Sequence, residues 1–233
     1  MLDIALRYKE MEIKIIYEDA DILVCEKPAG FPVQSRRIGQ KDCVSVLKTY
    51  LYKKEERKGE PYLGLIHRLD QPVEGLMAYA KTKNAAGNLS AQLSTDGFVK
   101  EYEAVVCGKM ELKSGKLTDY LKKDGKMNCS CVVDKNVQGA KRAELEYRVL
   151  EEKDGYSLVA VRLITGRHHQ IRVQMAHAGC PLCGDRKYGA PDQGTGGDSI
   201  GLCAARLSFL HPRTKKKMEF SMEPTGRCFA WFR

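Results

Sequence analysis

Three ionisable side chains occur within four residues in the stretch LIHRLDQPVEGLMAYAK, residues 65–81. His67, Arg68 and Asp70 precede a glycine-led apolar run that is typical of a strand. The carboxylate of Asp70 could act as a nucleophile or as a base if a neighbouring cation kept it ionised. A solvated acid in a surface turn is the ordinary alternative, so this spacing alone does not assign a role to Asp70.

A second polar group occurs in TGRHHQIRVQMAHAG, residues 165–179. At a strand-to-helix junction it offers side chains that carry positive charge or donate hydrogen bonds, among them Arg167, His168, His169, Gln170 and Arg172. An arginine from this segment could pair with Asp70 in a partly buried cleft and hold its carboxylate in one rotamer. A buried ion pair could also serve packing alone.

The histidines allow a metal site as a rival hypothesis. His67 and Asp70 are three residues apart, and His168 and His169 would add two more ligands for a metal-dependent nuclease or phosphodiesterase. No H-x3-H pair stands beside an acid on a predicted helix, so the sequence predicts no catalytic metal.

The chain that must position these groups has the composition of an ordinary globular protein with a sizeable core. It contains 233 residues, of which 43% are hydrophobic and 30% are charged. Its 39 Lys and Arg residues exceed its 30 Asp and Glu residues, and the formal net charge is +9. Such an excess often binds a polyanion, because cations that meet phosphates release counterions, although solubility alone is the other explanation.

Nine cysteines occur, mostly in apolar surroundings, and their odd number favours free thiols in a reducing compartment. The pairs Cys129/Cys131 and Cys180/Cys183 have spacings that zinc sites use, but the pairs lie far apart in the sequence. The first sixteen residues lack the apolar core of a signal peptide, and no run reaches transmembrane length. We therefore expect a cytoplasmic protein without a membrane or metal requirement.

Short β-like runs dominate the chain, and residues 143–150 and 156–163 show the clearest alternation. The predicted strands are 13–16, 21–27, 75–81, 99–108, 143–152, 156–164, 202–210 and 217–222. Helical patterns are fewer, at 42–56, 83–94 and 169–179. This order is not a regular β-α-β alternation, so we expect an α+β fold around a large mixed, mostly antiparallel sheet.

The sequence predicts Thr82 as the cap of the second helix and Gly179 as the end of the third. Two stretches have the composition of long loops, residues 53–61 and 189–201. Neither resembles a linker between domains. We therefore expect residues 1–233 to form one domain, with room for two lobes.

Five ordered blocks resemble the RluA-type RNA pseudouridine synthases over about residues 13–225. The block HRLDQPVEGLMAYAKT, 67–82, is similar to the family signature H-R-L-D-x-x-T-S-G-L-L-L-x-A-K. The other blocks are DILVCEKPAGFPVQS (21–35), KEYEAVVCG (100–108), LITGRHHQIRVQMAHAGCPLCGDRKYG (163–189) and LCAARLSFLHPRT (202–214). Their order makes the resemblance far more specific than any single motif.

The resemblance implies a pseudouridine synthase fold, with helices and loops around a central RNA-binding cleft. It implies an enzyme that isomerises specific uridines to pseudouridine in structured RNA, either ribosomal or transfer RNA, without a metal or organic cofactor. A catalytically silent RNA-binding or ribosome-assembly factor of the same fold is the alternative. We expect a standalone catalytic domain without an N-terminal RNA-binding domain, acting as a monomer on RNA without an obligate protein partner.

The resemblance also implies roles for individual residues. Asp70 would be the nucleophile, and Arg172 would pair with its carboxylate. Tyr102 would stack on the flipped base and assist the loss of the proton from C5, while Arg68 would enter the RNA and help to unstack the target uridine. Three further side chains would shape the cleft or its RNA-facing rim: Arg167, His169 and Gln170.

The chain departs from the family pattern at several positions. Val73 and Glu74 replace the usual Thr-Ser, and we expect the added carboxylate to face water on a turn. His168 replaces a common Thr and Gln174 replaces a common His, and both could tune the choice of substrate. None of these changes removes Asp70, so we expect activity to survive.

Overall fold

A computed structural model of the chain describes residues 4–8, 11–35, 37, 39–55, 59–95, 97–189 and 199–233. The chain forms two compact units. Unit 1 comprises Met1–Lys100 and Ala204–Glu223, and unit 2 comprises Glu101–Cys203 and Pro224–Arg233. Two of the three boundaries between these ranges fall within strands, β6 (Phe98–Cys107) and β11 (Leu202–Leu210), and the third lies between Glu223 and Pro224.

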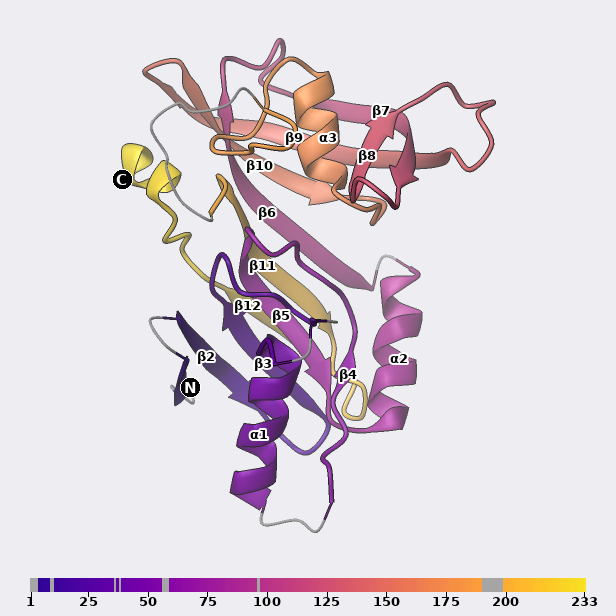
Figure 1. Ribbon diagram of the computed structural model, residues 1–233, viewed down its shortest axis with the longest axis vertical. Helices are drawn as coiled ribbons and strands as arrows, with labels where there is room; N and C mark the ends of the chain where they lie inside the picture. The colour runs from indigo at the N-terminus through magenta and orange to yellow at the C-terminus, as the bar shows by residue number, and fades with distance from the viewer. Residues whose placement is uncertain are drawn as a thin grey trace. The chain divides into compact units, whose positions relative to one another are not determined.

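Unit 1 contains a sheet in which the strands follow the order β1-β2-β3-β5-β11 (Figure 1). Strand β4 pairs with β5, and β12 pairs with β11. The strands introduced here are β1 (Ile4–Tyr8), β2 (Met11–Glu18), β3 (Ile22–Lys27), β4 (Gly64–Leu65), β5 (Glu74–Ala80) and β12 (Lys217–Ser221). The pairs β1/β2, β2/β3, β3/β5, β4/β5 and β11/β12 are all antiparallel.

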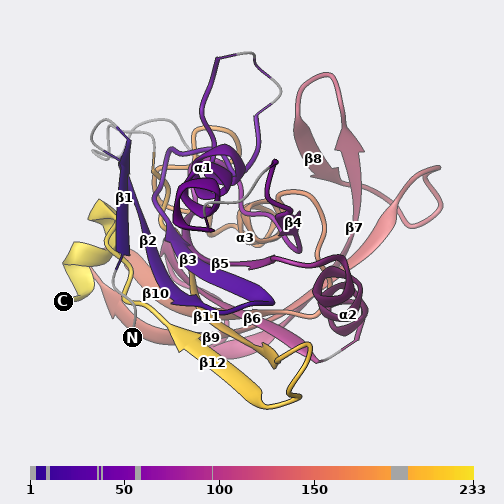
Figure 2. The ribbon, with the colours of Figure 1, turned by 90° about the horizontal axis from the view of Figure 1, so that it is seen from below.

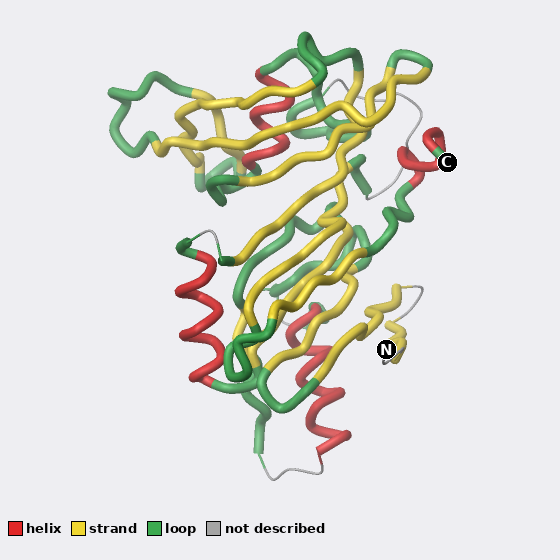
Figure 3. Tube along the Cα trace, turned by 180° about the vertical axis from the view of Figure 1, so that it is seen from behind, coloured by secondary structure: helices red, strands yellow, loops and turns green. Residues whose placement is uncertain are grey.

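Two helices accompany the strands of unit 1, shown in Figure 2 and in red in Figure 3. Helix α1 (Cys43–Glu55) buries Leu47 and Leu51, four residues apart, and its Cys43 lies close to Cys25 of β3. Helix α2 (Lys83–Leu93) begins behind Thr82, whose hydroxyl accepts a hydrogen bond from the N–H of Ala85 at 3.1 Å. An N-cap of this kind stabilises a helix by about 1 kcal/mol.

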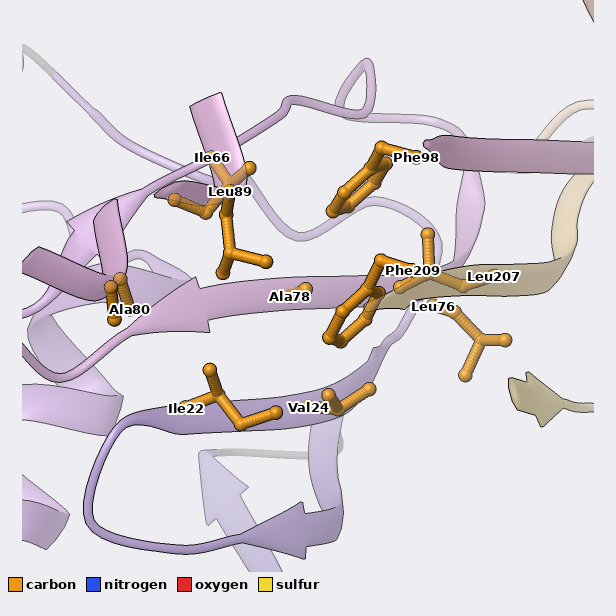
Figure 4. Packing of buried hydrophobic residues seen from close by; sticks show 11 residues of the cluster. Ile22, Val24, Ile66, Leu76, Ala78, Ala80, Leu89, Phe98, Leu207 and Phe209 are labelled. Carbon is orange, nitrogen blue, oxygen red and sulfur yellow. The ribbon is translucent and has the colours of Figure 1, made fainter. Parts of the chain in front are cut away.

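The core of unit 1 centres on strand β5, in which every residue is buried (Figure 4). Residues Leu76, Ala78 and Ala80 alternate along one face, where α2 contributes Leu89. The other buried members of this cluster are Ile22, Val24, Ile66, Ala85, Phe98, Leu207 and Phe209. Because β5 is buried on both faces, the loop that precedes it is held by a rigid strand.

Unit 2 contains a sheet in which the strands follow the order β6-β10-β9-β7-β8. Every pair in this order is antiparallel. The strands introduced here are β7 (Ser114–Asp124), β8 (Cys129–Val132), β9 (Lys141–Lys153) and β10 (Tyr156–Leu163). Strands β9 and β10 meet at Asp154 and Gly155, both with positive φ, as a tight hairpin turn requires.

Helix α3 (Gln170–His177) packs on β7 and β8 (Figure 1). Its Val173 lies in a buried cluster with Leu121 of β7, and Val132 of β8 packs against that cluster. The helix is followed by Gly179 at φ +78°, a left-handed conformation that glycine adopts without strain. The chain ends in a short 3-10 helix, η1 (Arg227–Phe232).

All the predicted helices and strands are present, and the α+β prediction is confirmed. The predicted loop at 53–61 is wrong at its start, because residues 53–55 belong to α1, and its residues 56–58 lie outside the described residues. Residues 190–198 of the second predicted loop also lie outside them. No helix in the described part of the chain is long and apolar enough to cross a membrane.

Candidate active site

The loop that carries Asp70 is anchored from within unit 1 by a buried lysine. The side chain of Lys27 is only 1% exposed, and its ammonium donates to the carbonyl oxygens of Pro28 and Phe31, both at 2.8 Å. It also donates to the carbonyl oxygen of Gln71, the neighbour of Asp70, at 3.1 Å. Lys27 therefore joins the turn after β3 to the loop before β5.

Two further bonds close this connection. The N–H of Gly30 donates to the carbonyl oxygen of Gln71 at 2.8 Å, and the Gln71 amide donates back to the carbonyl oxygen of Gly30 at 2.9 Å. Within the loop, the N–H of Val73 donates to the carbonyl oxygen of Asp70 at 3.1 Å. These bonds fix the backbone on both sides of Asp70.

Lys27 also contributes charge near the candidate nucleophile. Burial lowers the pKa of Lys27 to about 8, although the carboxylates of Asp70 and Glu74 act in the opposite direction. At neutral pH the ammonium therefore stays largely protonated beside the Asp70 loop. Lys27 was not predicted as a site residue from the sequence, although it lies in the quoted block at 21–35.

The prediction that Glu74 faces water is wrong. Glu74 is only 5% exposed because it begins the buried strand β5 rather than lying on a turn. It lies close enough to Lys27 for the two charges to interact. The added carboxylate is therefore a buried group of unit 1.

His67 is a buried, neutral histidine. Its Nε2 accepts a hydrogen bond from the N–H of Ala78 at 3.1 Å, and its ring meets the ring of Phe98 edge-on at 5.4 Å. Burial, with a smaller effect from Lys100, lowers the pKa of His67 to about 3. Because Nε2 accepts, Nδ1 carries the proton, and neither nitrogen offers a free lone pair to a metal.

The burial of the side chains alternates along residues 67–70. Leu69 is buried with His67, whereas Arg68 is exposed and Asp70 is half-buried. The loop therefore presents one cation and one carboxylate from a fixed backbone. This arrangement suits a carboxylate that reacts with a bound substrate and an exposed arginine that contacts a binding partner.

Tyr102, the second predicted catalytic residue, lies on strand β6 of unit 2. It is opposite Val161 of β10 in the antiparallel register, and it is 6% exposed. Neither neighbour along β6, Glu101 or Glu103, is buried. Burial therefore alternates along the strand around Tyr102.

Arg172, on helix α3, forms a bidentate ion pair with Asp185. Its Nε and one terminal nitrogen each lie 2.7 Å from an oxygen of this carboxylate, and the Asp185 side chain is fully buried. The guanidinium also lies over the ring of Tyr188, 5.1 Å from its centroid. Asp185 was not predicted as a site residue from the sequence, although it follows Gly184 in the quoted block at 163–189. Asp70 and Arg172 belong to different units, and their pairing stays a prediction.

His169 and Tyr188 extend this network in unit 2. The Nδ1 of His169 lies 2.7 Å from the hydroxyl of Tyr188, which also accepts the N–H of Ser130 at 2.7 Å. Burial, followed by the charge of Arg172, lowers the pKa of His169 to about 3. Burial also raises the pKa of Tyr188 to about 12. His169 is therefore a neutral group that shapes the surroundings of Arg172.

The buried side chain of Gln170 links two segments of backbone. Its amide nitrogen donates to the carbonyl oxygen of Glu144 at 2.9 Å, and its amide oxygen accepts the N–H of Arg167 at 2.9 Å. Arg167 itself is exposed, and its Nε donates to the carbonyl oxygen of Arg142 at 2.8 Å. Of the three predicted rim residues, Arg167 is the exposed one, whereas His169 and Gln170 are buried.

Gln174, which departs from the family pattern, is fully buried on α3. Its amide donates to the carboxylate of Asp119 at 2.7 Å and lies 3.3 Å from the carbonyl oxygen of Ala143. These contacts attach the helix to β7 and β9. Any effect of Gln174 on substrate choice must therefore pass through packing.

One group among the described residues has metal-ligand spacing, formed by Asp19, Asp21 and His211 of unit 1. Its ligand atoms are already engaged in protein contacts. The Nε2 of His211 lies 2.7 Å from the Asp19 carboxylate, and its Nδ1 accepts the N–H groups of Arg213 and Thr214. Asp21 pairs with Arg213. The group is best explained as a structural hydrogen-bonded cluster.

Comparison with known proteins gives a family for this arrangement. The family described as RNA pseudouridylate synthase matches residues 21–177, a span that contains Asp70, Tyr102 and Arg172. The chain is 39% identical over 181 residues to the ribosomal large subunit pseudouridine synthase D of Pseudomonas aeruginosa. That match covers 78% of this chain and 55% of the relative.

A second relative, the uncharacterized RNA pseudouridine synthase YlyB of Bacillus subtilis, is 35% identical over 213 residues. This match covers 90% of the chain and 68% of the relative. The solved structure of human RNA pseudouridylate synthase domain containing 4 has a TM-score of 0.75 at 25% identity, covering 91% of this chain and 88% of that one. As the RluA-type resemblance predicted, the chain belongs to the RNA pseudouridylate synthase family.

Proposed function

We propose that this protein isomerises uridines to pseudouridine in structured RNA. The observation that carries the proposal is the family match over residues 21–177, which includes all three predicted catalytic residues. The fixed loop around half-buried Asp70 and the buried pair of Arg172 and Asp185 support it. The chain spans 55% of the length of the Pseudomonas relative.

In this proposal Asp70 is the nucleophile. The bond between N1 of uracil and C1′ of ribose breaks, the base rotates, and C5 bonds to C1′. The proton on C5 is then lost and N1 gains one, so the product is an isomer of the substrate. Tyr102 would contact the flipped base, and exposed Arg68 would enter the RNA to unstack the target.

The proposed substrate is structured RNA, either ribosomal or transfer RNA. The names of the relatives from Pseudomonas aeruginosa and Yersinia pestis refer to the large ribosomal subunit, which makes this RNA the first to test. We propose that the enzyme acts in the cytoplasm as a monomer whose partner is RNA. The net charge of +9 supports a polyanionic partner.

The test is nucleoside analysis of large-subunit ribosomal and transfer RNA transcripts after incubation with the protein in the presence of a chelator. Digestion and chromatography separate pseudouridine from uridine, and an Asp70→Asn variant is the matched control. We expect pseudouridine with the unaltered chain and none with the variant. Binding of RNA without pseudouridine from either transcript would reject the enzyme in favour of the catalytically silent alternative.

A further inference from the structure

Several cations in each unit are paired with acids. In unit 1, Lys48 pairs with Glu60, and Lys54 and Lys81 both pair with Glu18. In unit 2, one end of the sheet shows the same pattern. There Lys113 pairs with Glu152, and Lys116 and Arg142 both pair with Glu144. Such cations have little charge left for an external partner.

A different pattern occurs around the β7–β8 hairpin and the segment after Asp185. Several exposed cations there have no ion-pair partner within the described part of the chain: Lys122, Lys123, Lys126, Arg186 and Lys187. Among the nearby acids, Asp185 pairs with Arg172, and Asp119 contacts Gln174 and His177. Asp124, in the hairpin itself, accepts the N–H groups of Lys126 and Met127, and it is outnumbered by the five cations. This part of unit 2 therefore carries excess positive charge.

The two neighbouring lysines of β7 face opposite sides of the sheet. Leu121 is buried in the cluster that includes Val173 of α3, so its face of β7 is the α3 face. Side chains alternate along a strand, which places Lys123 on the α3 face and Lys122 on the opposite face. Both are exposed.

The partner strand brings His168 to the same face. Lys123 is opposite Ser130 of β8, and the Ser130 hydroxyl lies 2.9 Å from Nδ1 of His168. The half-buried ring of His168 stacks on His169 with centroids 3.8 Å apart. An imidazole therefore lies next to the hairpin at a position where the family commonly has Thr.

Lys187 connects the segment after Asp185 to the β7–β8 hairpin. Its ammonium donates to the carbonyl oxygen of Asn128 at 2.8 Å, while the next residue, Tyr188, accepts the N–H of Ser130. Lys123, His168 and Lys187 are all close enough to add to the effect of burial and Arg172 on the pKa of His169. The hairpin, the start of α3 and the segment after Asp185 thus converge.

We propose that Lys123, His168 and Lys187 form a phosphate-binding rim that holds the backbone of the substrate RNA beside Arg172. The inference rests on the proposed function. A lysine contributes a compact positive charge with three donors, which suits a phosphate without demanding one geometry. Phosphate contacts position an RNA without reading its sequence, so the rim would act on binding rather than on the chemical step.

Lys123→Gln tests the rim, and Lys122→Gln on the same strand is the matched control. RNA binding is measured between 50 and 200 mM salt in an Asp70→Asn background, so that turnover does not interfere. One lost phosphate contact should reduce the slope of log affinity against log salt by about 1 for Lys123→Gln. The slope for Lys122→Gln should stay unchanged. Equal slopes for the two variants would overturn the proposal that Lys123 belongs to a phosphate-binding rim.

His168→Thr, which restores the family residue, gives a second readout in the active chain. We expect KM for RNA to rise several-fold with kcat retained, because the rim acts in binding. A fall in kcat with unchanged KM would overturn the rim. Suppose that the chain with Asp70 intact makes no pseudouridine, but Lys123→Gln alone changes the slope of log RNA affinity against log salt. The proposed function would then be wrong, and the phosphate-binding rim would be supported.

Discussion

At the residue scale, neighbouring side chains around Asp70 differ in burial and in charge. His67 is buried and uncharged, whereas Arg68, the next residue, is exposed. Lys27 supplies a buried cation that holds three carbonyl oxygens around the loop. Asp70 therefore stands on a backbone whose position is set by anchors that take no part in the proposed chemistry.

The buried His67 predicts a loss of stability in acid. Its pKa in the folded protein, about 3, lies below the ordinary value of 6.5, so the folded state binds fewer protons and stability falls as the pH drops below 6.5. Between pH 7.5 and 5 this histidine should cost about 2 kcal/mol of unfolding free energy. Denaturant unfolding of the unaltered chain and His67→Gln at both pH values measures it. An equal loss in the two proteins would contradict the account.

The sequence could locate the chemically suggestive residues but not their partners. Asp70, Tyr102 and Arg172 stand in motifs, and each can be read from its neighbours in the chain. Asp185 is thirteen residues from Arg172, and its bidentate pairing depends on how the chain returns after α3. The burial of Glu74 was missed for a similar reason, because a turn and a strand start look alike in sequence.

At the element scale, Gly75 permits the close approach of two strands. It adopts φ +141°, and a Cβ at this position would lie 2.5 Å from the backbone nitrogen of Ala204 on β11. No side chain can occupy that space unless the backbone moves. Since Gly75 follows Glu74 at the start of β5, the loop that carries Asp70 depends on this glycine.

Gly75→Ala should therefore destabilise the protein by about 3 kcal/mol or more. Gly87 offers the matched control, because it is exposed within α2 and an added Cβ there would meet no atom within 4 Å. Gly87→Ala should stabilise the helix by about 0.5–1 kcal/mol. Denaturant unfolding of both variants is the measurement. A Gly75→Ala protein as stable as the unaltered chain would show that β5 and β11 are not tightly packed.

The predicted elements were those with strong local signals. Helix α2 has a cap at Thr82, and β5 has an uninterrupted apolar run. Strands β7 and β8 were missed because β7 has mostly exposed and half-buried residues. The pairing of β7 with β9 and with β8, and the packing of α3 on β7 and β8, come from tertiary contacts that composition does not reveal.

At the scale of the whole molecule, the feature that bears most on RNA binding is the excess of positive charge. The net charge of +9 includes cations in both units that are paired with acids, as well as the exposed group around β7 and β8. Pairing reduces what the paired cations can offer to a polyanion. RNA affinity should therefore depend on a limited set of phosphate contacts rather than on the total charge.

The affinity for RNA should fall about tenfold or more between 50 and 200 mM salt, because each phosphate contact releases a counterion. Filter binding with a structured transcript measures this. A neutral osmolyte at matched osmolality is the control, and it should leave the affinity nearly unchanged. Binding that does not respond to salt would contradict a phosphate-based interface.

The most direct test of the central claim is tritium release from RNA labelled at uridine C5, followed for the unaltered chain and for Asp70→Asn. The label leaves as the hydron that C5 loses after its bond to C1′ has formed. We expect release in step with pseudouridine formation by the unaltered chain. Asp70→Asn should be slower by about a thousandfold or more, with RNA affinity within about threefold. Release by Asp70→Asn at a rate within tenfold of the unaltered chain would show that Asp70 is not the nucleophile.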